Sequence, residues 1–189
     1  MDLLPDQPKT LEQWRPYLRA LARMQIENQF QAKIDASDIV QQTLLEAHRG
    51  LKQFRGESDD ELRGWLRRIM ARNLADEVRK FRRGKRDAGL EQSLQDALTS
   101  SSMGLERYLD GGTTSPDNRA IRNEQLIGLS VAIESLPEDQ RRAVTLHHLQ
   151  GKSSAEIAIQ IDKTEIAIAG LLRRGLKQLR ESMQETTEE

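Results

Sequence analysis

Helical periodicity is the feature of this sequence that most constrains its fold. Apolar residues recur at intervals of three and four along most segments, and no segment alternates apolar and polar residues as a strand would. In the stretch that follows Asp35, a favourable N-cap, Val40, Leu44, Ala47 and Leu51 form one such stripe, which predicts a helix with a single buried face. The sequence therefore predicts an all-α protein.

The composition of the 189 residues narrows the class of protein. Cysteine is absent, which excludes disulfides and cysteine-bound zinc within the chain. No apolar run approaches the length of a membrane span, and the first residues lack the pattern of a signal peptide, so we expect a cytoplasmic protein. A glycine-rich phosphate loop, a hydrolytic triad and paired carboxylates are all missing from the sequence. We therefore expect no enzymatic activity and no cofactor.

The adjacent His147 and His148 are the one hint of a metal site. Neighbouring residues on a helix point to different faces, and the sequence supplies no suitably spaced carboxylate pair beside them. We expect no metal to bind there.

Charge is distributed unevenly along the chain, although the net charge is only −1. Between Arg63 and Arg86 many basic residues face only two acidic ones, Asp76 and Glu77, whereas the tail after Arg180 carries acidic residues alone. A solvated face usually mixes both signs. The asymmetry instead favours a basic surface for nucleic acid and an acidic tail exposed to solvent.

Two domains and a connection between them follow from local composition. Residues 88–115 contain the polar runs Thr99–Ser102 and Gly111–Ser115, which are typical of a flexible linker. Four leucines within this segment suggest that part of it docks or is transiently helical: Leu90, Leu94, Leu98 and Leu105. The sequence thus predicts one helical domain in residues 1–87, a flexible linker in 88–115, a second helical domain in 116–182 and an acidic tail in 183–189.

The second domain shows a helix-turn-helix pattern. A helix that begins at Pro137 should stop at Gly151, and Ser153 with Glu156 forms a capping box for a short helix. After a tight turn, Thr164 caps a longer helix that carries four basic residues, Arg173, Arg174, Lys177 and Arg180. A short helix, a turn and a longer basic helix are typical of duplex-binding modules.

Three stretches resemble extracytoplasmic-function sigma factors, a subfamily of the sigma-70 RNA polymerase sigma factors. Asp35–His48 resembles the helix that grips the β′ clamp helices of core polymerase. Phe54–Ser58, with Trp65–Ile69 and Ala71–Ala75, resembles the segment that recognises and melts the −10 promoter element. Leu136–Arg180 resembles the domain that binds the −35 element and the polymerase β flap.

For the polymerase contact, the resemblance implies Asp38, Gln41, Gln42 and Leu45, which lie off the buried stripe. An exposed leucine among polar groups suits a protein interface, and the alternative is that Leu45 widens the core stripe. Members of the family commonly carry glutamate where Gln42 stands, and an amide retains the ability to hydrogen-bond.

For the −10 element, the resemblance implies a loop and a basic helix. The expected contacts are Phe54, Arg55, Glu57, Ser58, Arg67, Arg72, Asn73, Arg79, Lys80, Arg82 and Arg83. Cations hold phosphates, an amide pairs with a base edge, and an aromatic ring stacks on an extruded base. Trp65 is in phase with Leu62 and Ile69, which favours a place in the core over stacking on a base.

For the −35 element, the expected contacts are Lys163, Thr164, Glu165, Arg173, Arg174 and Lys177. The start of this recognition helix lacks the polar tips that read bases, because Ala167, Ala169, Gly170 and Leu171 occupy it. We therefore expect −35 recognition to depend on DNA shape and phosphates. Alternatively, Ile166 and Leu171 form an apolar patch for a regulator or for the other domain.

These patterns predict an alternative sigma factor whose partners are core RNA polymerase, promoter DNA and a regulator such as an anti-sigma factor. Two alternatives stay open. An ordinary helix-turn-helix regulator would leave Asp35–His48 and Phe54–Ala75 unexplained. A sigma-like protein-interaction module would account for the apolar start of the recognition helix.

Overall fold

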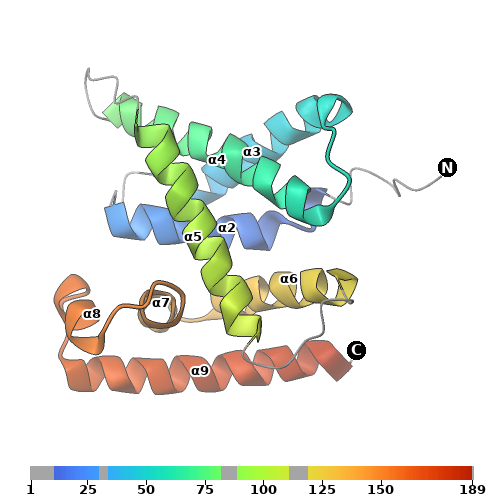
Figure 1. Ribbon diagram of the computed structural model, residues 1–189. Helices are drawn as coiled ribbons and strands as arrows, with labels where there is room; N and C mark the ends of the chain where they lie inside the picture. The colour runs from blue at the N-terminus through green and yellow to red at the C-terminus, as the bar shows by residue number, and fades with distance from the viewer. Residues whose placement is uncertain (1–10, 30–33, 82–88, 111–118, 189) are drawn as a thin grey trace. The chain divides into compact units, whose positions relative to one another are not determined.

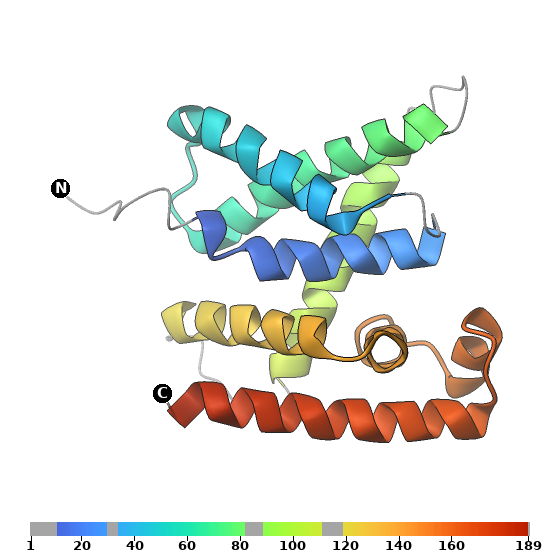
Figure 2. The ribbon, with the colours of Figure 1, turned by 180° about the vertical axis from the view of Figure 1, so that it is seen from behind.

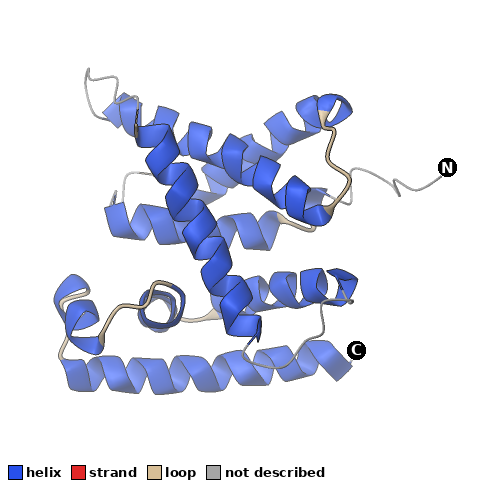
Figure 3. Ribbon diagram, viewed as in Figure 1, coloured by secondary structure: helices blue, strands red, loops and turns tan. Residues whose placement is uncertain are grey.

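The computed structural model describes residues 11–29, 34–81, 89–110 and 119–188. Every regular element in these ranges is helical, and none of them forms a strand (Figure 3). The prediction of an all-α fold is confirmed. The described residues divide into two compact units, with the boundary between Ser100 and Ser101.

The first unit is built around helix α3. It contains α2 (Arg15–Gln29), α3 (Ala36–Gly50), the single 3₁₀ turn η1 (Leu51–Gln53) and α4 (Asp59–Phe81). Helix α3 packs against both α2 and α4 (Figure 1). The largest side chains buried in this unit come from the segment around α2, from α4 and from residues 90–100: Trp14, Tyr17, Leu18, Leu21, Leu66, Met70, Leu74, Leu94 and Leu98. Their burial supplies the apolar core on which the outer faces of α3 and α4 are displayed.

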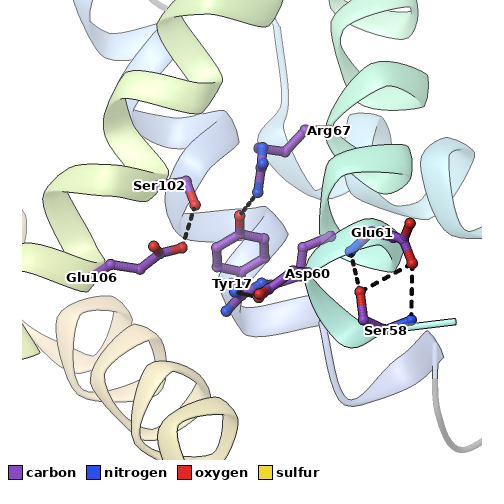
Figure 4. A network of polar contacts seen from close by, with 8 residues as sticks. Tyr17, Ser58, Asp60, Glu61, Arg67, Ser102 and Glu106 are labelled. Carbon is purple, nitrogen blue, oxygen red and sulfur yellow. Dashed lines mark hydrogen bonds and ion pairs between the residues drawn. The ribbon is translucent and has the colours of Figure 1, made fainter. Parts of the chain in front are cut away.

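Local capping sets where α3 and α4 begin. The Asp35 side chain accepts a hydrogen bond of 2.7 Å from the Ser37 backbone N–H, which confirms the predicted cap. At α4, the Glu61 carboxylate accepts from the backbone N–H and the hydroxyl of Ser58, both at 3.1 Å (Figure 4). In return, the Glu61 N–H donates to the Ser58 hydroxyl at 3.3 Å. This reciprocal pair is a capping box that the sequence analysis did not identify.

The segment expected to be a flexible linker is largely helical. Helix α5 runs from Leu90 to Asp110 and includes the run Thr99–Ser102. Leu94, Leu98 and Leu105 are buried, as the spacing of the leucines allowed. Burying this apolar stripe outweighs the weak helix propensity of serine and threonine, so the linker prediction is wrong for these residues. The second polar run, Gly111–Ser115, lies outside the described residues.

The second unit is built on helix α9. It contains α6 (Arg119–Ser135), α7 (Glu138–Val144), the π-helical turn η2 (Thr145–Leu149), α8 (Ser154–Gln160) and α9 (Glu165–Glu188). Helix α9 packs along α6, α7 and α8 (Figures 1 and 2). A Cβ atom on Gly175 would lie 2.7 Å from Val144 Cγ2, so glycine permits the close approach of α9 to α7.

The predicted stops and caps of this unit are confirmed, and two details differ. Gly151 has a φ of 72°, which suits a helix stop, and Ser153 forms a capping box with Glu156. The helix that precedes Gly151 ends in the π-helical turn η2 and is not a single α-helix. Residues 183–188, expected to be a separate acidic tail, continue α9. Within the described residues, no helix is both long enough and apolar enough to span a membrane.

Candidate functional site

The outer row of α3 consists of Asp38, Gln41, Gln42 and Leu45, and all four side chains are exposed. Leu45 is 47% exposed, whereas Val40, Leu44 and Ala47 are buried. The alternative that Leu45 widens the buried stripe is therefore excluded. The structure thus displays one leucine among a carboxylate and two amides, which is the composition of an apolar anchor within a polar rim.

Glu46 joins this outer row to α4. Its carboxylate accepts a 2.7 Å hydrogen bond from the Gln42 amide and forms an ion pair with Arg72. Sequence reasoning missed Glu46. The sequence shows that Glu46 follows Leu45, but it does not show that Glu46 contacts Arg72 of α4.

The basic row of α4 consists of Arg68, Arg72 and Arg79, which share one face because they are four and seven residues apart. Arg72 is paired with Glu46, Arg79 with Asp76 at 2.6 Å, and the neighbouring Lys80 with Glu77 at 2.6 Å. Such pairs at a surface contribute little stability, so these cations can exchange a carboxylate for a phosphate. Arg68 lies within the basic stretch between Arg63 and Arg86 but was not predicted as a contact. Arg82 and Arg83 lie outside the described residues.

Arg67 has a structural contact that the basic row lacks. Its Nη1 donates a 2.7 Å hydrogen bond to the Tyr17 hydroxyl, and its side chain is half-buried (Figure 4). Of the predicted cations on α4, it is therefore the one tied to the interior of the unit by a hydrogen bond. Tyr17 was not predicted as a partner, because the two residues lie far apart in sequence.

The loop before α4 holds a stacked aromatic pair. The rings of Phe54 and Trp65 lie 4.9 Å apart with an interplanar angle of 28°, and both are half-buried. A Cβ atom on Gly56 would lie 2.2 Å from Phe54 Cζ, so glycine is required for this loop to close over the ring. Trp65 is thus neither fully in the core nor fully available for stacking. Arg55 and Glu57 are exposed in the same loop.

Asn73 lies inside the unit and not on its surface. It is only 8% exposed, and its amide donates a 3.2 Å hydrogen bond to the Thr43 hydroxyl of α3. The Thr43 hydroxyl in turn donates to the Ile39 carbonyl at 2.7 Å. The structure therefore separates Asn73 from the exposed loop residues with which the sequence analysis grouped it.

Helices α8 and α9 of the second unit meet in a tight turn, as the predicted helix-turn-helix requires. Asp162 adopts a left-handed conformation with a φ of 54°, and the Lys163 N–H donates to the Ala158 carbonyl at 2.9 Å. The Thr164 hydroxyl accepts a 3.2 Å hydrogen bond from the Ala167 N–H and so caps α9. Lys163 forms an ion pair of 3.0 Å with Asp139 of α7.

The outer stripe of α9 consists of Ile166, Gly170, Arg173 and Lys177, which recur at intervals of three and four. Ile166 is 87% exposed. The opposite face is buried and contains Ile168, Leu172 and Leu179. Glu165 and Arg174 are exposed on either side of the stripe, and Lys177 lies 3.7 Å from the carboxylate of Glu181.

Leu171 does not join Ile166 in an exposed patch. It is only 8% exposed, so the predicted patch of Ile166 and Leu171 is wrong. Helix α9 packs against three other helices, and its buried face is therefore wider than the spacing of its leucines indicated.

His147 and His148 lie in the π-helical turn with their rings edge to face and 4.7 Å apart. The expectation that the two side chains point to different faces is thus wrong, because their rings contact each other. The His147 Nδ1 is hydrogen-bonded to the Lys152 carbonyl at 2.8 Å. Across the part of the chain that the structure describes, no group of three metal-binding side chains is found.

Comparison with known proteins assigns both units. Residues 10–84 match the family model for sigma-70 region 2, and residues 127–179 match that for sigma-70 region 4. The chain is 32% identical over 128 residues to the ECF RNA polymerase sigma-E factor of Salmonella typhimurium, covering 68% of this chain and 63% of the relative. It is 29% identical over 124 residues to the RNA polymerase sigma-H factor of Pseudomonas aeruginosa, covering 66% of this chain and 60% of the relative.

One solved structure covers 96% of the chain and 98% of its own, with 22% identity and a TM-score of 0.35. It is the sigma factor RpoE from Bartonella quintana in complex with the anti-sigma factor NepR. This likeness is too weak to define the fold. The chain spans less than two thirds of the length of the two relatives above.

The two family matches define a protein of the sigma-70 class, in which region 2 is followed by region 4. The chain belongs to the extracytoplasmic-function subfamily of the sigma-70 family.

Proposed function

We propose that this chain is an alternative sigma factor, which binds core RNA polymerase and directs initiation at specific promoters. The observation that carries the proposal is the pair of family matches, region 2 on the unit of α2 to α4 and region 4 on the unit of α6 to α9.

The outer row of α3 is the proposed contact with the β′ clamp helices of polymerase. Leu45 is the anchor, because truncating or charging a central apolar residue of an interface usually removes a large part of the binding energy. Asp38, Gln41 and Gln42 form the polar rim. The region 4 unit would contact the β flap.

The loop of Phe54 and the basic row of α4 are the proposed −10 site. Arg68, Arg72 and Arg79 would hold phosphates, and for Arg72 and Arg79 a phosphate would replace the present acidic partner, Glu46 or Asp76. The Phe54 ring, stacked on Trp65, would support a base extruded from the duplex. We assign Asn73 to the support of this site, since its amide is engaged with Thr43.

Helix α9 is the proposed −35 element reader, with Arg173, Arg174 and Lys177 on phosphates and Thr164 and Glu165 at its start. Because Ala167, Ala169 and Gly170 carry no polar tips, hydrogen-bonded readout of bases should be sparse. A footprint with strong dependence on several guanine or adenine edges in the −35 element would contradict this assignment.

Transcription from genomic DNA fragments with core polymerase and the purified chain tests the proposal. We expect discrete transcripts that depend on the added chain. If core polymerase does not bind the chain, the assignment as a sigma factor fails. If core polymerase binds but no specific transcripts start, the interaction-module alternative replaces it, and the exposed Ile166 would then be a contact for a protein partner.

A matched pair of variants tests the proposed anchor. Leu45→Glu should weaken binding to core polymerase at least tenfold, because it places a charge at the centre of an apolar contact. Val131→Glu changes an equally exposed residue, 50% accessible and on α6, and should leave the affinity within about twofold. Equal losses in the two variants would exclude Leu45 as the anchor.

A further inference from the structure

The start of the recognition helix α9 presents one large apolar side chain to solvent. Ile166 is 87% exposed, and the next residue on the outer stripe is Gly170. Its flanking exposed neighbours, Ala167 and Ala169, are also small. The isoleucine therefore projects beyond its surroundings, and nothing in its own helix covers it.

The position of Ile166 is the one from which recognition helices contact bases. In a helix-turn-helix, the N-terminal residues of the second helix reach base edges, and the residues further along lie near phosphates. Ile166 lies in the first turn after the Thr164 cap, whereas Arg173 and Lys177 come two and three turns later on the same stripe. The stripe thus begins with an apolar group and continues with cations.

Only one feature of a base pair in the major groove suits an aliphatic side chain. Donors and acceptors line the edges of all four bases, but thymine alone adds an apolar group, its C5 methyl. In the first turns of α9, Glu165 beside the stripe supplies an acceptor for a base amino group, while Ile166 and Gly170 on the stripe offer neither donor nor acceptor from their side chains.

We propose that Ile166 is a specificity residue that reads thymine in the −35 element through apolar contact with its C5 methyl. This inference rests on the proposed function, since it takes α9 to lie in the major groove of promoter DNA. An apolar contact of this kind can distinguish thymine from the other bases even where side-chain hydrogen bonds to bases are few. If this surface bound a protein partner instead of DNA, the affinity for promoter DNA would not depend on the thymine methyl.

The test removes the methyl group and nothing else. Holoenzyme assembled from the full chain and core polymerase first selects short duplexes from a randomised pool that contains thymine. In a selected duplex, each thymine is then replaced singly by deoxyuridine, and the affinity is measured by fluorescence anisotropy. We expect at least one replacement in the −35 element to weaken binding about fourfold, which is the effect of exposing one buried methyl-sized group.

Two variants locate the effect on the protein. Ile166→Ala should bind the thymine and the deoxyuridine duplex equally, because the contact is lost. Ile159→Ala should keep the fourfold preference, since Ile159 is an equally exposed isoleucine, 84% accessible, on the preceding helix α8. Both side chains are exposed, so neither change should affect folding.

The outcomes separate the two levels of inference. If the unaltered holoenzyme binds selected duplexes but never distinguishes thymine from deoxyuridine, the methyl readout is wrong and the proposed function stands. A preference that persists in Ile166→Ala also overturns the role of Ile166. If the holoenzyme selects no duplex at all, the proposed function fails and this inference falls with it.

Discussion

The hydrogen bond from Asn73 to Thr43 gives Asn73 a role in stabilising the fold, although the sequence predicted that Asn73 contacts a base. The amide donates to a hydroxyl that is itself buried between α3 and α4. Truncation to Asn73→Ala leaves that hydroxyl without one partner, and we expect the free energy of unfolding to fall by about 1–2 kcal/mol. Urea unfolding of the purified chain measures this loss.

A double-mutant cycle with Thr43→Val provides the control, because both variants remove the same hydrogen bond. The two losses should sum to more than the loss in the double variant, by about 1 kcal/mol. Asn73 would instead be a direct DNA contact if Asn73→Ala left unfolding unchanged and reduced promoter binding alone.

We expect His148 to make the stability of the second unit depend on pH. Burial of its ring, and second the charge of the neighbouring His147, lower the pKa of His148. Because the folded state then binds fewer protons than the unfolded state, stability falls as the pH drops through the ordinary histidine pKa of about 6.5. Unfolding of the wild type between about pH 7.5 and pH 5.5 should show this loss. His148→Gln should flatten the dependence, and an unchanged slope would rule out His148 as the cause.

Single residues were predictable from sequence where one helical stripe decides their position. Leu45 was correctly distinguished from Val40, Leu44 and Ala47 because the period of α3 places it off the buried face. Asn73 and Leu171 lie at the edges of such stripes, and the packing of further helices against those edges decides their burial. That packing is a tertiary property, which periodicity does not contain.

Two glycines of α9 should respond to alanine in opposite directions. At Gly170 a Cβ atom would meet only the mobile end of Arg174, at 3.2 Å, so Gly170→Ala should stabilise the unit by up to about 1 kcal/mol. At Gly175 it would meet Val144, a buried and branched side chain, at 2.7 Å. Gly175→Ala should therefore destabilise the unit by about 1–2 kcal/mol in spite of its better helix propensity.

Hydrogen exchange of the α9 amides measures both changes within one unit, whatever the stability of the other. Both variants replace glycine by alanine on the same helix, so the gain from helix propensity is the same in each. The difference between their stabilities therefore reports the packing around the new methyl group. Stabilisation by both variants would mean that α9 and α7 do not approach as closely as the structure has them.

At the scale of elements, the helices were predictable and the connection between the domains was not. Periodicity located the helices around Val40, Ile69 and Leu172, and capping residues located the starts of α3, α8 and α9. The run Thr99–Ser102 was taken for a linker from composition alone. Low propensity in four residues costs little when buried leucines before and after them hold the helix, so composition misled where the apolar period was the better guide.

The chain as a whole carries a net charge of −1, so it has no overall attraction for DNA. Binding must depend on local basic groups, the basic row of α4 in the first unit and the outer stripe of α9 with Arg174 in the second. Because these groups belong to separate units, losses from the two should add. The slope of log K for DNA binding against log salt then gives the number of phosphates that each unit contacts.

Neutralising two adjacent arginines of α9, as Arg173→Gln with Arg174→Gln, should weaken promoter binding by the holoenzyme and reduce its salt dependence. Each phosphate contact contributes about 0.9 to the slope of log K against log salt, so the double variant should lose about 1.8. Arg15→Gln is the control, since Arg15 belongs to neither basic group and forms a 2.7 Å ion pair with Glu12. It should leave the slope unchanged. Because a phosphate contact carries no base information, the double variant should also keep the order of preference among promoters, and a reordering would show that these arginines read bases.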